Sequence, residues 1–216
     1  MADYTRVVYQ GGQGEIIEKK SRFLADVAAV KSEEEVSVFL EGIRKKYWDA
    51  GHHCSAFVLG ELNEISRCSD DGEPSGTAGR PILDVLIGSG VRNACVVVTR
   101  YFGGVLLGTG GLVRAYGRAA REGLDASILL DKIPGEKLSL TCDYNSIGKI
   151  QYIAGNAGYS ALESVYGADV CLTYLIPAEE SERFRKAVTE ATGGRTRIES
   201  LGAQDYAILE KEFILL

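Results

Sequence analysis

The feature that most constrains the fold of this 216-residue sequence is an apolar segment that runs into a Gly-rich turn. Residues 94–99 (ACVVVT) are mostly apolar and rich in β-branched side chains, as expected for a strand that is buried on both faces. Residues 103–111 (GGVLLGTGG) form the turn, and we expect a long helix over 112–130. Such a turn brings backbone N–H groups and the positive end of a helix dipole to one place, which is the architecture of an anion site.

The turn differs from two common nucleotide-binding motifs. No Lys follows the glycines in the G-K-[ST] position of a P-loop, and residues 104–110 do not fit G-x-G-x-x-G. On the expected helix, Arg114, Arg118 and Arg121 lie at positions i, i+4 and i+7, which places three guanidinium groups on one stripe. A solvated helix face is the simple alternative. Arg114 is nearest the glycines, so we expect it to pair with a bound anion, whereas Arg118 and Arg121 suit a partner surface.

A second unusual segment precedes the apolar run. Residues 69–79 (SDDGEPSGTAG) concentrate carboxylates, hydroxyls and glycines. Because Asp, Gly, Pro and Ser all form turns, an ordinary surface turn would explain them. The functional alternative is a polar ligand loop, in which glycines let backbone N–H groups approach a ligand and carboxylates hold a cation or a donor.

His52 and Cys54 alternate along an expected strand, so they share one face and His53 lies on the other. A Cys–His nucleophile pair is one interpretation, and ordinary packing with a buried hydrogen bond is the one we favour. The two histidines of the chain are too few for a His-rich metal site. The five cysteines contain no C-x-x-C pair, so we expect reduced thiols and no structural zinc.

The formal net charge of −6 opposes nonspecific binding to phosphate backbones, so any nucleic-acid contact must be local. The first ten residues lack an apolar secretory segment. The apolar runs are far shorter than the ~20 residues of a membrane helix. We therefore expect a soluble, cytoplasmic protein that has no membrane partner.

The remaining pattern indicates two α+β domains. Ser32 to Glu35 spell a capping box before a helix that extends to about Lys46. In the same domain we expect extended structure over 15–30, strands over 54–59 and 61–68, and a helix over 81–87. After Pro134 we expect the βαββαβ order of ferredoxin-like domains, with strands over 137–142, 160–166, 169–176 and 195–200 and helices from 145 and over 178–192. We place the boundary near Lys132 to Gly135, which gives domains 1–133 and 134–216.

Several motifs resemble those of the IMPACT family, including its bacterial members. They are KKSRF at 19–23, His52 with Cys54 and Ala56, DDGEPSGTA at 70–78, and VTRYFGG at 98–104 continuing through LG at 107–108 to GGLVRAY at 110–116. These motifs cover most of residues 15–125, and the βαββαβ tail matches the second domain of the bacterial members.

The resemblance implies an N-terminal α+β domain like those of ribosomal proteins, of domain IV of elongation factor G and of GHMP-class kinases. It also implies a tail like the last domain of elongation factor G. In the eukaryotic relative, the family domain is tied to translational control through the activator of the amino-acid-starvation kinase. Members often carry Thr where Gly51 stands, and we expect this chain to lack the RWD domain of the eukaryotic proteins. The resemblance therefore implies a shared surface, not a shared partner.

Three hypotheses follow. The first is a noncatalytic binding protein linked to regulation of translation, without cofactor or metal, that holds RNA phosphate, a nucleotide or a ribosome-associated partner. The second is an enzyme acting on a phosphorylated or carboxylated small molecule, with Asp70, Asp71 or Glu73 as base or metal ligand. The third treats the glycines as architecture and assigns the function to the C-terminal domain. The candidate ligand-binding residues are Asp70, Asp71, Glu73, Ser75, Gly76, Thr77, Arg100, Tyr101, Gly103, Gly104, Gly108, Gly110, Gly111 and Arg114, with His52 and Cys54 as further candidates.

Overall fold

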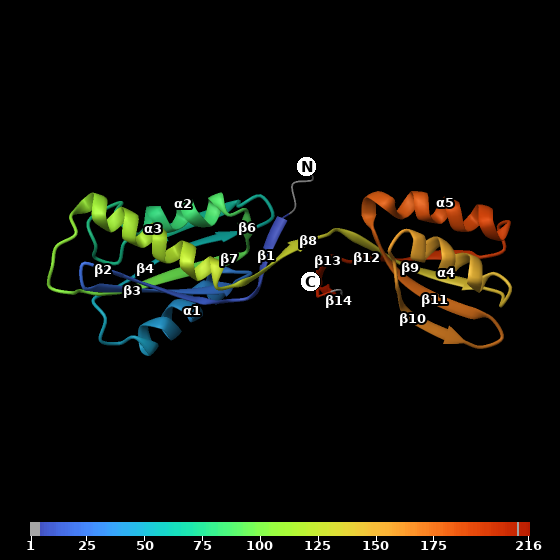
Figure 1. Ribbon diagram of the computed structural model, residues 1–216, viewed down its shortest axis with the longest axis horizontal. Coiled ribbons are helices and arrows are strands. Elements are labelled where there is room, and N and C mark those ends of the chain that lie inside the picture. The colour runs from blue at the N-terminus through green and yellow to red at the C-terminus, as the bar shows by residue number, and fades with distance from the viewer. Residues whose placement is uncertain (1–4, 211) are drawn as a thin grey trace. The chain divides into compact units, whose positions relative to one another are not determined.

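The computed structural model describes residues 5–210 and 212–216 and divides into two compact units, Met1–Asp131 and Lys132–Leu216. Figure 1 shows that each unit packs helices on a β-sheet, which confirms the expected α+β class. Independent folding of the two units stays a prediction. Among the described residues, no helix has the length and apolar character needed to cross a membrane.

The first unit is built on a five-stranded antiparallel sheet with β7 at its centre. The strand order is β2 (Gln13–Glu18), β3 (Ser21–Ala29), β7 (Ala94–Tyr101), β4 (His52–Leu59) and β5 (Ile65–Ser69). Almost every residue of β7 is buried, which confirms the strand expected over 94–99. A second sheet of three strands joins β6 (Val91–Arg92), β1 (Thr5–Gln10) and β8 (Ile128–Lys132).

Helices cover both faces of the five-stranded sheet (Figure 1). Cys95 and Val97 of β7 face α1 (Glu33–Lys46). Val96 and Val98 face α2 (Gly79–Gly88) and α3 (Thr109–Asp125). Because successive side chains of a strand point to opposite faces, one short apolar run contributes to two cores.

The start of α1 resembles the expected capping box, except that the reciprocal bond comes from Lys31 and not from the N-cap Ser32. The Glu35 N–H donates to Ser32 Oγ at 3.3 Å, and the Glu35 carboxylate accepts the Lys31 N–H at 2.7 Å. Two otherwise unpaired backbone donors are satisfied in this way, which fixes where the helix begins.

Two expected element boundaries are wrong. The helix expected over 112–130 begins at Thr109 and ends at Asp125, and residues 128–132 form strand β8. Short apolar runs suit a helix end and a strand equally well, so only pairing with β1 decides between them. The strand expected over 61–68 begins at Ile65, because Asn63 adopts a φ of 58° in the preceding turn.

The second unit has the expected βαββαβ order. Its antiparallel sheet has the order β10 (Ala161–Tyr166), β11 (Val170–Pro177), β9 (Gly135–Cys142) and β12 (Arg197–Ala203). The helices α4 (Ile147–Asn156) and α5 (Ser181–Thr192) enclose its core, and η1 (Ala178–Glu180) precedes α5. Gly193 ends α5 with a φ of 61°, as expected for a glycine after a helix. The hairpin of β13 (Tyr206–Leu209) and β14 (Glu212–Leu215) was not expected.

Candidate binding site

All five strands of the sheet have an end at the same place. Strands β2, β5 and β7 end there, and β3 and β4 begin there. Arg100 of β7 lies opposite His52 on one side and Phe23 on the other. Because neighbouring strands are antiparallel, the loop over 70–78 and the turn over 102–108 leave the sheet at the same end. The fold thus brings the two unusual segments together.

Asp70 organises the loop that follows β5. Its Oδ1 accepts the N–H groups of Ala78 at 3.0 Å and Gly79 at 2.8 Å, and its Oδ2 accepts the Gly76 N–H at 2.8 Å. Burial acts to raise the pKa of this carboxyl, but the three donors outweigh burial and hold its pKa below the ordinary value. The carboxylate therefore closes the loop and caps the start of α2.

Asp71 joins the loop to the opposite face of the sheet. Its Oδ2 accepts the His53 N–H at 2.7 Å, and its Oδ1 accepts a bond from Arg44 of α1 at 2.9 Å. The Asp71 carbonyl oxygen lies 2.9 Å from His52 Nδ1. These contacts use both carboxylate oxygens, so Asp71 is an internal bridge.

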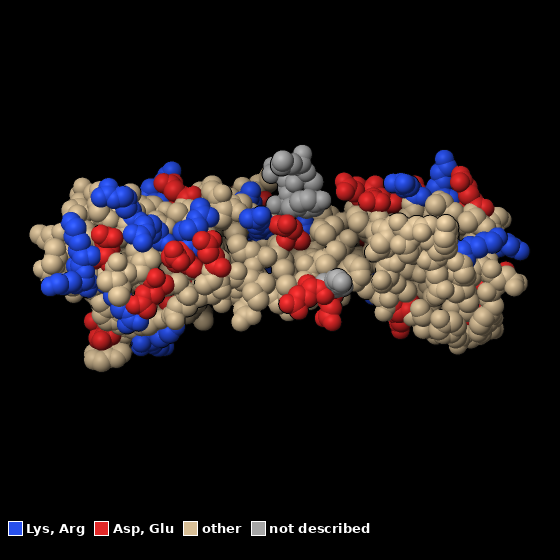
Figure 2. Space-filling model, in the orientation of Figure 1, with Lys and Arg blue, Asp and Glu red and all other residues tan. Residues whose placement is uncertain are grey.

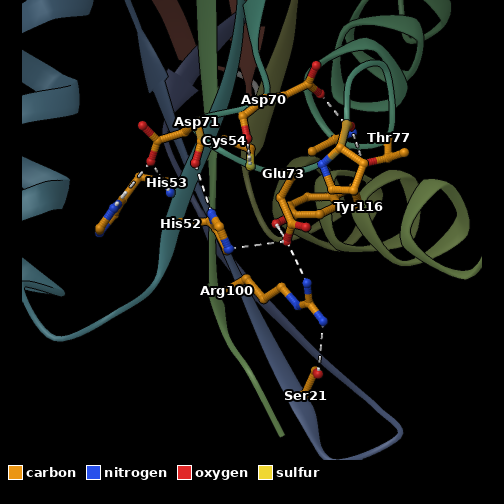
Figure 3. A network of polar contacts seen from close by, with 12 residues as sticks. Ser21, His52, His53, Cys54, Asp70, Asp71, Glu73, Thr77, Arg100 and Tyr116 are labelled. Atoms are coloured by element: carbon orange, nitrogen blue, oxygen red, sulfur yellow. Dashed lines mark hydrogen bonds and ion pairs between the residues drawn. The ribbon is translucent and has the colours of Figure 1, made fainter. Parts of the chain in front are cut away.

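Glu73 lies at the centre of a buried network (Figure 3). Its Oε1 accepts bonds from Arg100 Nη1 at 2.6 Å and from the Tyr116 hydroxyl at 2.8 Å. His52 Nε2 is 4.0 Å from the same oxygen. The side chains of Glu73 and Arg100 are only 4% and 7% exposed, so this ion pair is shielded from water.

Arg100 is held on several sides. Its guanidinium carbon lies 5.4 Å from the centre of the Phe23 ring and 5.5 Å from that of Phe102, and its Nη2 donates to Ser21 Oγ at 3.4 Å. Cation–π contacts of this kind add to the ion pair. Arg100 thus has its charge matched inside the protein, which makes it a support for the turn and not an exposed contact.

Cys54 is buried on the same face as His52, as expected, while His53 faces α1 and lies 3.1 Å from the Tyr47 carbonyl oxygen. The Cys54 thiol donates to the Asp70 carbonyl oxygen at 3.0 Å. Burial raises its pKa to about 12. Because the thiolate is the reactive form, such a thiol is unsuited to nucleophilic catalysis.

The fold therefore joins some of the candidate residues and separates others. Asp70, Glu73, Thr77 and Arg100 belong to one network, whereas Tyr101 points to the other face and donates to Asp49 at 2.8 Å. Ser75 and Gly76 lie exposed in the loop, Gly104 and Gly108 are exposed in the turn, and Gly110 is exposed at the start of α3. The described residues include no cluster of three or more side chains able to hold a metal ion.

Sequence reasoning did not select Tyr116 or Ser21 as site residues. Tyr116 lies on the buried face of α3 and packs edge-on against Phe23, with ring centres 5.1 Å apart. A buried Tyr hydroxyl usually has a hydrogen-bond partner. A tyrosine on the apolar face of an expected helix is therefore the signal that would have pointed to Tyr116. Ser21 sits beside two lysines and carries no comparable signal.

The Gly-rich turn interlocks with the β2–β3 hairpin. Ser21 Oγ accepts the Gly103 N–H at 3.2 Å, and a Cβ at Gly103 would overlap the main chain of Lys20. The two residues at the hairpin tip, Lys19 and Lys20, have φ values of 45° and 68°. A tight two-residue hairpin turn requires such positive φ values, which Gly and Asn adopt far more easily than Lys. Backbone strain is thus concentrated where the hairpin meets the turn.

Lys20→Gly is expected to raise the free energy of unfolding by about 1 kcal/mol, because glycine adopts positive φ without a clash of its Cβ. Urea unfolding of the full chain measures the change. Lys45→Gly, within α1, is the control and should lower stability by a similar amount. A loss of stability in Lys20→Gly would mean that the lysine side chain matters more than the backbone strain.

These observations define the class of protein. It is a two-domain α+β protein, and its first unit has a buried polar network at one end of the five-stranded sheet. Residues 19–124 match the Impact N-terminal domain, and residues 140–195 match a domain of unknown function, DUF1949. The chain is 39% identical over 191 residues to the IMPACT family member YvyE of Bacillus subtilis, covering 88% of each protein. It is 38% identical over 182 residues to YigZ of Escherichia coli, covering 83% of this chain and 89% of YigZ. The chain belongs to the IMPACT family.

Two solved structures are also similar. The crystal structure of a hypothetical protein shares 34% identity with a TM-score of 0.59, covering 94% of this chain and 99% of the other. The structure of Yih1, described as a two-domain translational regulator, shares 26% identity with a TM-score of 0.38, covering 55% of this chain and 48% of Yih1.

Proposed function

We propose that this chain is a noncatalytic binding protein linked to the regulation of translation. Its partner surface is the sheet end formed by the loop over 70–77 and the turn over 100–114. The observation that carries the proposal is that the central charged groups are already bonded to groups inside the protein. Asp70, Asp71 and Glu73 each use their carboxylates on internal donors, and Arg100 is paired with Glu73. Side chains used in this way support a rigid surface better than they support a reaction.

The link to translation is carried over from the family. Yih1 is described as a translational regulator, and the sequence motifs resemble those of a family tied to translational control. The bacterial relatives match this chain over most of their length, which makes both units part of the comparison. The nature of the partner is inferred from the surface itself.

The exposed part of the site is basic and apolar. Arg114 lies in the second turn of α3, whose N-cap Gly108 provides no side-chain cap for the free backbone N–H groups. In the turn before it, Phe102 is 58% exposed and Leu106 is 83% exposed. Figure 2 shows Lys and Arg side chains over α3 and beside the end of β2 and β3, with acidic side chains between them. Such a surface suits an anionic partner, either RNA phosphate or a ribosome-associated protein.

Wild-type protein is expected to co-sediment with ribosomes, and Arg114→Ala is expected to weaken the interaction by about tenfold through loss of a charge-assisted contact. Arg121→Ala is the matched comparison, because Arg121 lies about two turns further along α3 and its loss should weaken binding less than the loss of Arg114. A shallow decrease of binding with rising salt is expected if only a few phosphates are contacted. Equal losses for the two variants would indicate a diffuse basic face. Failure of the wild type to recover RNA or a ribosome-associated protein would overturn the proposed function.

A further inference from the structure

A small pocket lies between the tip of the β2–β3 hairpin and one side of α3. Its volume is about 110 Å³. Leu107 and the buried Ala115 form its apolar wall, and Glu18, Lys19, Arg114 and Arg118 provide its charged groups. The cations come from two elements that are far apart in the sequence, so their convergence is a product of the fold.

The charges of the pocket are not balanced. Arg118 forms an exposed ion pair with Glu18 at 3.4 Å. Lys19 and Arg114 have no ion-pair partner within the described part of the chain. Three positive charges and one negative charge leave a local balance of +2 in a protein whose formal net charge is −6. An excess of positive charge against the sign of the whole chain is the electrostatic footprint of an anion site.

We propose that this pocket binds the terminal phosphate of a phosphate monoester. A monoester carries a charge of roughly −1.5 to −2 at neutral pH, which matches the local excess, whereas the diester of a nucleic-acid backbone carries one negative charge. With a volume of about 110 Å³ the pocket is small, so it suits a compact anion such as a phosphate group.

The fold holds the pocket in place. Lys19 occupies a hairpin tip with positive φ, and the neighbouring Ser21 accepts the Gly103 N–H, which ties the hairpin to the turn before α3. Arg114 and Arg118 lie one turn apart on the same helix. The apolar wall lowers the local dielectric and so strengthens attraction to an anion. The inference deepens the proposed function by naming the chemical group that is held, but its test is separate.

The test compares 5′-phosphorylated with 5′-hydroxyl forms of one short single-stranded RNA, and AMP with adenosine, using the full chain at one salt concentration. The phosphorylated member of at least one pair is expected to bind about tenfold more tightly. Lys19→Gln and Arg114→Gln should abolish that preference. Lys20→Gln is the matched control, because Lys20 is the adjacent lysine, also has a positive φ and does not line the pocket. Circular dichroism and urea unfolding show whether each variant keeps the wild-type fold.

A preference for phosphorylated RNA supports an RNA 5′ end as the source, and a preference for AMP alone supports a free nucleotide. Two results would contradict the phosphate site. One is the absence of a preference in both pairs, and the other is a preference that persists in a folded Lys19→Gln variant. If the wild type co-sediments with ribosomes but shows no preference for the phosphorylated ligands, the phosphate site is contradicted and the proposed function is supported. If AMP binds in the pocket but no RNA or ribosomal partner is recovered, the phosphate site is supported and the proposed function is contradicted.

Discussion

Glu73→Ala is expected to lower the free energy of unfolding by about 3–5 kcal/mol. The substitution removes the carboxylate that Arg100 contacts at 2.6 Å and that accepts the Tyr116 hydroxyl at 2.8 Å. Both side chains of the ion pair are almost completely buried, so the variant would keep an uncompensated guanidinium away from water. Removing one partner of such a pair is far more costly than replacing both, because the remaining charge stays buried without the carboxylate that balanced it.

Urea unfolding of wild type, Glu73→Ala and the double variant Glu73→Leu with Arg100→Met measures this effect. The double variant is expected to recover much of the lost stability, since it leaves no buried charge. Glu15→Ala is the control, because Glu15 forms an exposed pair with Arg22 at 2.7 Å and should contribute at most about 1 kcal/mol. If Glu73→Ala costs no more than Glu15→Ala, the buried network does not hold the loop.

Asp70→Asn is expected to lower the free energy of unfolding by about 2 kcal/mol at neutral pH, because the asparagine amide cannot accept all three backbone N–H groups of the loop. The effect should depend on pH. The folded protein holds the Asp70 pKa below the ordinary value of about 3.9, so the charged carboxylate stabilises the fold above that pH. This stabilisation is lost as the pH falls through the folded-state pKa.

The difference in stability between wild type and Asp70→Asn should therefore be largest near pH 7 and shrink below about pH 4. Unfolding curves at both pH values test this expectation. Asp84→Asn is the matched control on α2, where Asp84 forms an exposed pair with Arg80 at 2.8 Å, and its cost should stay within about 0.5 kcal/mol. A pH-independent difference for Asp70→Asn would show that the loop is held by shape and not by charge.

Part of the candidate site could be predicted from the sequence because its residues form continuous motifs. The loop over 70–78 and the turn over 102–108 each stand out by composition, and the fold places them at one end of the sheet. The role of each residue could not be predicted in the same way. Asp70 and Arg100 were candidates for contacting a ligand, but one caps a helix and the other is buried against Glu73. A carboxylate or a guanidinium looks the same in a sequence whether it faces a ligand or an internal partner.

Local sequence determined the elements whose signals are local. Short apolar runs placed β4 and the buried β7, a capping box placed the start of α1, and glycine ended α5, because each depends on side chains within a few residues of one another. Only the tertiary structure decided that residues 128–132 form a strand and that Tyr116 meets Glu73. It also decided that Lys19 and Arg114 share a pocket. Those outcomes depend on contacts between residues distant in the chain, where burial and pairing outweigh local preference.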